Sequence, residues 1–144
     1  MTDHARIVGH SVQDFQEWIK SIDHAMDLAD EQKAYAILRG VLHQLRDRLT
    51  VEEAAHLGAQ LPTLVRGVYY EAFAPSALPE KERHEDTFLT RVAERIRRDD
   101  VDPELAARTV FALLKARVDA GELRHVIHMM PHEVQRLWDG AAAA

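Results

Sequence analysis

The chain has 144 residues, 47% of them hydrophobic and 29% charged, a balance that excludes a disordered chain and suits one domain with one core. The net charge of −6 provides no basic field for nucleic acid, and the absence of cysteine excludes disulfides and thiolate metal sites. Because the sequence also lacks a signal peptide and any apolar run of membrane-spanning length, we expect a cytoplasmic protein that binds neither nucleic acid nor membrane.

The first two helices follow from apolar residues that recur at steps of three and four. Residues 15–26 have this spacing, so we expect a helix with one buried face and with Ser11 as its N-cap. A second helix should begin at the next capping residue, Asp30, and continue to residue 49. Its charged side chains fall largely outside the apolar stripe, and they include Arg39, Arg46, Asp47 and Arg48.

A capping box marks the start of a third helix. Thr50 and Glu53 have the spacing at which each side chain accepts a hydrogen bond from the backbone amide of the other residue. Pro62 lacks an amide hydrogen, so it either kinks this helix or opens a fourth one over residues 63–73. Residues 74–86 contain two prolines, mixed charge and no apolar periodicity, and they form the expected linker.

The same order of apolar spacings and helix caps recurs after the linker. Apolar spacing predicts a helix around residues 88–96, and Asp102 with Pro103 forms a cap followed by a first-position proline. A further helix continues to Val118, and residues 119–122 repeat the capping-box spacing. No segment shows the two-residue alternation of a strand, so we expect an all-α fold.

The two halves of the chain are related by an ungapped shift of 69 residues, the interval between Pro62 and Pro131. The shift also pairs Val41 with Val110, Leu45 with Leu114, Arg48 with Arg117, Glu53 with Glu122, His56 with His125 and Val65 with Val134. These matches include caps and apolar positions, which indicates a repeated supersecondary unit. We therefore expect a single helical bundle of two tandem, pseudo-symmetric units of about four helices each, at about residues 11–73 and 87–139.

Two Glu-x-x-His spacings at equivalent positions are the clearest candidate for a metal site. Glu53 with His56, and Glu122 with His125, each place a carboxylate and an imidazole on one helix face, as in helix bundles that bind two iron or manganese ions. However, both glutamates stand at the third position of a capping-box spacing, and helix initiation already explains them. The sequence favours this structural role, with metal binding as the alternative.

No constellation in the sequence indicates catalysis. The sequence contains no nucleophile elbow, no phosphate-binding glycine loop and no zinc-protease motif. We therefore expect no catalytic residue and no cofactor. An aromatic cluster that includes Tyr70 and Phe73 is typical of core packing, and a partner-binding groove is the alternative.

Residues 43–73, which read HQLRDRLTVEEAAHLGAQLPTLVRGVYYEAF, resemble the bacterial family catalogued as domain of unknown function number 2267. The resemblance extends from Phe15 to Trp138. It implies an all-helical bacterial protein without an assigned activity, so no functional residue is carried over. Because the second half departs more from the family's strings, a specific surface should lie in the first half, around Asp47, Arg48, Gln60, Arg66 and Tyr70.

The leading hypothesis is a non-enzymatic protein that acts by binding, as a protein-interaction or stress-related accessory module. Its partner would be another protein or a second copy of the chain, and Phe73 completes the candidate surface. A metal-binding protein built on the Glu-x-x-His pairs is the alternative. A small-molecule sensor with an apolar pocket between the two halves is a third hypothesis.

Overall fold

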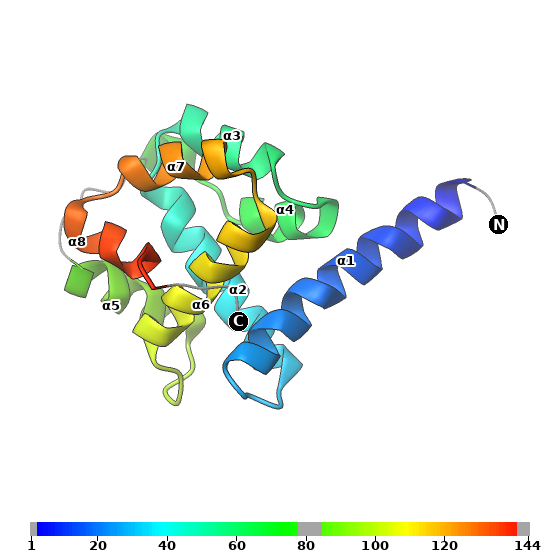
Figure 1. Cartoon of the computed structure of the whole chain (residues 1–144), viewed down its shortest axis with the longest axis horizontal. Coiled ribbons are helices and arrows are strands. Elements are labelled where there is room, and N and C mark those ends of the chain that lie inside the picture. Colours follow the sequence, from blue (N-terminus) through cyan, green and yellow to red (C-terminus); the bar gives the residue numbers. More distant parts are fainter. Residues whose placement is uncertain (1–2, 78–84, 141–144) are drawn as a thin grey trace.

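The computed structural model describes residues 3–77 and 85–140, and every regular element in these residues is a helix (Figure 1). The first half contains α1 Asp3–Ala25, α2 Glu31–Asp47, α3 Val51–Ala59, α4 Thr63–Tyr70 and a 3₁₀ turn, Pro75–Ala77. The second half contains α5 Glu85–Ile96, α6 Pro103–Arg117, α7 Ala120–His128, α8 His132–Gln135 and a 3₁₀ turn, Arg136–Trp138. The predicted all-α class is confirmed. No helix in the described residues is both long enough and apolar enough to cross a membrane.

Four helices, α2, α3, α6 and α7, begin where a capping side chain accepts hydrogen bonds from their first amide groups. The Asp30 carboxylate accepts from the Lys33 amide at 3.0 Å and opens α2. At α3 both bonds of the capping box are present, with 3.2 Å between Glu53 N and Thr50 Oγ1 and 2.9 Å between Thr50 N and Glu53 Oε1. The carboxylates of Asp102 and Asp119 cap α6 and α7, respectively. These predicted N-caps are confirmed.

The first helix is longer than the sequence pattern indicates. α1 begins at Asp3, so the prediction of Ser11 as its N-cap is wrong. Residues 3–14 project from the rest of the molecule, as the dark blue end of α1 in Figure 1 shows. We call residues 3–14 the overhang.

Two other helix boundaries also differ from the prediction. Pro62 is the N-cap residue of a new helix, α4, which ends at Tyr70 instead of continuing to residue 73. α5 begins at Glu85, inside the predicted linker, and residues 78–84 of that linker lie outside the described residues.

α2 lies at the centre of the fold and connects the two halves. It packs against α1 and α4 of the first half and against α5 and α6 of the second half. α3 and α7 also pack on each other (Figure 1). A single cluster of buried apolar side chains therefore runs through both halves.

Two equivalent contacts favour the predicted repeat. Arg46 of α2 donates to the carbonyl oxygen of Tyr69 at 2.7 Å. Lys115 of α6 and Trp138 stand 69 residues after these two, and the Lys115 ammonium donates to the Trp138 carbonyl oxygen at 3.2 Å. A basic side chain thus holds the segment that follows the proline in each half. The pseudo-symmetry of the two units stays a prediction.

The contact between α2 and α5 depends on Gly40. A Cβ atom at this position would lie 2.8 Å from Ile96 Cγ1 and 3.1 Å from the Ile96 backbone nitrogen. We expect Gly40→Ala to lower the free energy of unfolding by about 1–3 kcal/mol, because α5 must shift to make room. This loss outweighs the roughly 1 kcal/mol by which alanine is the better helix former. Chemical denaturation measures the change.

Gly67 of α4 provides the matched control for that substitution. A Cβ atom at Gly67 would meet no atom within 4 Å. Gly67→Ala should therefore raise the free energy of unfolding, by up to about 1 kcal/mol. If both variants were equally stable, the close approach of α5 to α2 would be contradicted.

Candidate functional site

The first Glu-x-x-His pair lies in α3, and its two side chains have separate contacts. The Glu53 carboxylate accepts from the Thr50 amide, as capping requires. His56 is exposed, and its Nε2 lies 3.9 Å from a carboxylate oxygen of Glu52, one turn before it. Glu53 therefore starts the helix, and the nearest carboxylate to His56 belongs to another residue.

The second pair lies in α7 and has the same placement. The Asp119 carboxylate accepts from the Glu122 amide at 3.1 Å, and His125 is exposed. In residues 3–77 and 85–140, no three His, Asp or Glu side chains come together as metal ligands would. The geometry of the described residues thus favours the capping role of Glu53 and gives the metal hypothesis no support.

Asp47, a candidate interaction residue, lies in an internal ion network. Its carboxylate accepts from Arg46 Nε at 2.8 Å and from Nη2 of Arg95 on α5, also at 2.8 Å. Arg95 Nε in turn donates to the Gln44 side chain at 2.9 Å. Only 13% of the Asp47 side chain is exposed. Asp47 therefore joins α2 to α5.

Arg46 is buried, although the sequence pattern placed it outside the apolar stripe. It is 1% exposed, and its Nη1 donates to the carbonyl oxygens of Tyr69 and Glu71, both at 2.7 Å. Its guanidinium group also lies 5.2 Å from the centre of the Phe73 ring. The predicted placement is wrong because Arg46 satisfies carbonyl groups at the end of α4, which are too far along the chain for a helix pattern to reveal.

Arg66 and Gln60 lie where α3 meets α4. Arg66 Nε donates to the carbonyl oxygen of Gly58 at 3.0 Å, and its Nη2 donates to that of Leu61 at 2.9 Å. These bonds satisfy carbonyl groups at the end of α3. Gln60 is the exposed C-cap residue of α3. The contacts of Arg66 are internal, and the use of this surface by a partner stays a prediction.

The aromatic candidates are half-buried. The Tyr70 ring lies between those of Tyr69 and Phe73, with centroid distances of 5.0 and 5.6 Å. Both Tyr70 and Phe73 pack against the core. Arg48, the remaining candidate, is half-buried at the end of α2. The aromatic cluster thus lies partly inside the fold.

Three exposed large apolar side chains lie on the overhang, among them Ile7 and Val8, the two most exposed in the described residues. Ile7 is 66% exposed, Val8 51% and Val12 43%. Val8 and Val12 continue at steps of four, three and four residues into Phe15 and Ile19, which pack on the core. We call Val8, Val12, Phe15 and Ile19 the α1 stripe. It has the spacing of the a and d positions of a heptad repeat.

The sequence analysis did not identify Val8 and Val12 because it placed the start of the helix at Ser11, a good capping residue, and counted the apolar spacing only from residue 15. The signal that could have found them is the continued spacing, from residue 8 to residue 12 and on to residue 15. Helix spacing alone does not show which part of a stripe is covered, since that depends on the packing of other helices.

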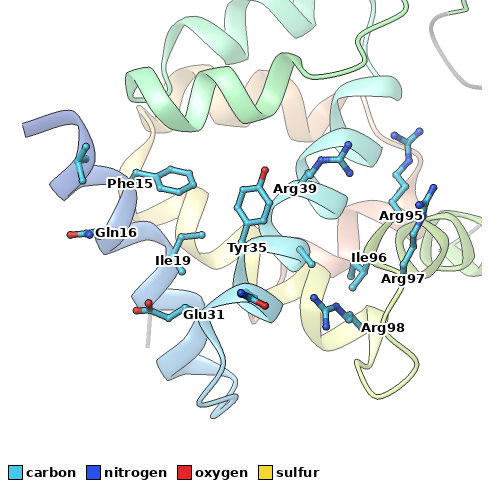
Figure 2. A pocket seen from close by; sticks show the side chains of 13 residues that line it. Phe15, Gln16, Ile19, Glu31, Tyr35, Arg39, Arg95, Ile96, Arg97 and Arg98 are labelled. Atoms are coloured by element: carbon cyan, nitrogen blue, oxygen red, sulfur yellow. The ribbon is translucent and has the colours of Figure 1, made fainter. Parts of the chain in front are cut away.

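A groove of about 750 Å³ lies beside the α1 stripe, between α1, α2 and the end of α5 (Figure 2). Its apolar wall combines Val12, Phe15 and Ile19 of α1 with Tyr35 of α2, and the Phe15 and Tyr35 rings meet edge to face with centroids 6.2 Å apart. The charged residues that line the groove are Arg39, Arg95, Arg97, Arg98 and Glu31. We call it the arginine groove.

The charge of the arginine groove is predominantly positive. Arg39 Nε lies 3.2 Å from a Glu71 carboxylate oxygen, and Arg95 belongs to the ion network described above. Arg97 and Arg98 are exposed in the turn after α5, where Arg97 adopts a φ of 59°, a left-handed conformation that often ends helices. Because Arg39 and Arg95 already pair with Glu71 and Asp47, the groove's exposed positive charge is that of Arg97 and Arg98, which favours an acidic or neutral ligand.

The Tyr35 hydroxyl is a polar group on the otherwise apolar wall. Burial raises the pKa of Tyr35, and the Glu71 carboxylate raises it further, while Arg39 partly offsets both effects. The phenol therefore stays protonated at neutral pH. It hydrogen-bonds the Glu71 carboxylate and adds no negative charge to the groove.

Comparison with known proteins identifies a relationship over most of the chain. The model of the family described as "Uncharacterized conserved protein (DUF2267)" matches residues 15–137. The match begins at Phe15, which follows the overhang, and ends at Leu137, inside the 3₁₀ turn Arg136–Trp138. No curated protein matches the chain.

Proposed function

Since the chain belongs to the DUF2267 family, whose description names no activity, we propose a function from the surface of this member: it is a non-enzymatic protein-interaction module. The α1 stripe and the arginine groove together form the surface that holds the partner. The observation that carries this proposal is the exposure of Val8 and Val12 on a projecting helix, in register with the buried part of the same stripe.

The overhang is unfavourable for an isolated chain. Ile7, Val8 and Val12 expose branched apolar side chains on a helix that leaves the body of the protein. Scattered apolar residues are normal on a protein surface, but a contiguous exposed group typically marks an interaction site. A partner that covers these side chains would remove this apolar area from water.

The arginine groove fits an amphipathic helix better than a small compact ligand. Its apolar side chains lie on α1 and at Tyr35 of α2, Arg39 follows Tyr35 on α2, and Arg95, Arg97 and Arg98 lie on the side away from α1 (Figure 2). A helix with an apolar face and some acidic side chains would contact both sides, as in other helix-in-groove complexes. Cytoplasmic placement is part of the proposal, since a cysteine-free helical module is compatible with a reducing compartment.

Site-specific photo-crosslinking tests the proposal. When a benzophenone amino acid replaces Val8 in the full chain, irradiation should give discrete products in which the chain is crosslinked to its partner protein. Mass spectrometry then identifies that partner. Val51 is the matched control, because it is also an exposed valine, 47% accessible against 51% for Val8, but lies on α3. The absence of products from position 8, or equal products from both positions, would refute the interaction surface.

A further inference from the structure

We infer that the partner at this surface is a second copy of the chain, and that the two overhangs are exchanged. The overhang of each copy lies antiparallel to α1 of the other copy, in that copy's arginine groove. This inference rests on the proposed function and names its partner. It follows from the composition of the overhang, the heptad spacing, the area of the contact and the charges of the two surfaces.

The overhang is a weak helix on its own. Its sequence, DHARIVGHSVQD, includes Ile7, Val8, Gly9 and Val12, which are all poorer helix formers than alanine or leucine. The overhang continues a helix of 23 residues whose packed part supplies the nucleus, but these residues make the extension of that helix less favourable. Packing against a partner would therefore stabilise the helical state of the overhang.

The α1 stripe is suited to pairing with another helix of the same kind. In an antiparallel pair, a positions face d positions, so Val12 of one copy lies beside Phe15 of the other and Val8 lies beside Ile19. Gly9, Ser11 and Gln16 flank the stripe and are uncharged. Two identical helices can therefore approach without like-charge repulsion next to the contact.

The size of the overhang limits how the two copies can meet. The overhang is about 18 Å long and a helix about 10 Å wide, so two overhangs that touch only each other bury roughly 400 Å² in total. A stable interface needs at least about 1,200 Å². Each overhang must therefore also contact the body of the other copy. We place this contact in the arginine groove, since Val12 belongs both to the stripe and to the groove wall.

The charges of the overhang and of the groove are complementary. The overhang carries two carboxylates, Asp3 and Asp14, and one arginine, Arg6. Arg97 and Arg98 give the groove an exposed positive edge, at the turn that follows α5. The exchange thus places a weakly acidic helix in a basic groove, and the twofold relation between the copies repeats this contact.

Sedimentation velocity and native mass spectrometry of the full chain test the inference. Between about 1 and 100 µM, we expect a species of twice the chain mass. Val12→Glu should weaken dimerisation at least about 100-fold, because each dimer would bury two carboxylates against apolar side chains. Glutamate forms helix better than valine does, so this substitution does not weaken α1 itself.

Val51→Glu is the control, since it makes the same change at a similarly exposed position on α3. It should leave the dimer dissociation constant within about 2-fold of the original value. A dimer that persists in Val12→Glu as strongly as in Val51→Glu would overturn the exchange of overhangs, since the copies would then meet elsewhere.

Spin labels report the orientation of the two helices, and the absence of native cysteine allows single labelled sites. In the antiparallel arrangement, labels at His4→Cys lie about 30 Å apart across the dimer, whereas labels at Gln13→Cys lie within about 20 Å. Short distances at both positions would indicate parallel helices and refute the arrangement. A chain that stays monomeric, while position 8 crosslinks to a different protein, would refute the second copy and leave the interaction function standing.

Discussion

Arg46→Ala is expected to lower the free energy of unfolding by about 3–5 kcal/mol, the range measured when one partner of a buried ion pair is removed. The guanidinium group bonds two backbone carbonyl oxygens at the end of α4 and the Asp47 carboxylate beside it, and it lies over the Phe73 ring. Alanine would leave both carbonyl groups without this donor and would open a cavity where a 1%-exposed side chain now lies. Chemical denaturation at neutral pH measures the loss.

Two further substitutions separate the causes of that loss. Arg46→Lys keeps the charge but lacks the planar fork that reaches two carbonyl groups and a carboxylate together, so it should restore only part of the stability. Arg124→Ala removes an arginine from the exposed face of α7 and should change the free energy of unfolding by less than about 0.5 kcal/mol. If Arg46→Ala were as mild as Arg124→Ala, the buried network would contribute little to the fold.

Acidification is expected to remove about 3 kcal/mol of stability through His43 alone. The ring is 3% exposed, and its Nε2 donates to the Val68 carbonyl oxygen at 2.7 Å in the neutral form. The pKa of His43 is lowered from 6.5 to about 4, chiefly by burial; the bond to the Val68 carbonyl opposes this shift, and the nearby guanidinium groups of Arg46, Arg39 and Arg95 contribute to it.

The direction of the pH effect follows from the two states of the chain. In the unfolded chain His43 takes up a proton near its ordinary pKa of 6.5, whereas in the folded chain it stays neutral until about pH 4. The stabilisation is therefore complete above pH 6.5 and is lost as the pH falls from 6.5 towards 4. Carboxylates add their own pH dependence, so a variant must isolate the part due to His43.

His43→Gln isolates that part, because glutamine retains a donor for the Val68 carbonyl oxygen and does not titrate. The difference in unfolding free energy between the original chain and this variant should shrink by about 2–3 kcal/mol between pH 7.5 and pH 4.5. His128→Gln, at an exposed position of α7, should leave the pH dependence unchanged. A pH-independent difference for His43→Gln would show that the ring titrates normally in the folded protein.

The sequence predicted less of the candidate site than of the fold. The N-caps at Asp30, Thr50, Asp102 and Asp119 were predicted correctly, whereas the equivalence of the two Glu-x-x-His pairs stays a prediction. The arginine groove could not be predicted, because Phe15, Tyr35 and Arg97 meet only when α1, α2 and the end of α5 pack together. Arg46 was assigned to the surface for the same reason, since its two carbonyl partners lie 23 and 25 residues away.

The sequence by itself determined the helical class and the residues at which most helices begin. Those features depend on hydrogen bonds and side-chain contacts within about four residues, such as the capping box of Thr50 and Glu53. Only the tertiary structure decided which charged groups are buried and which apolar groups are left uncovered. Arg46 is buried because the end of α4 needs donors, and Val12 is exposed because, in residues 3–77 and 85–140, no other helix covers it.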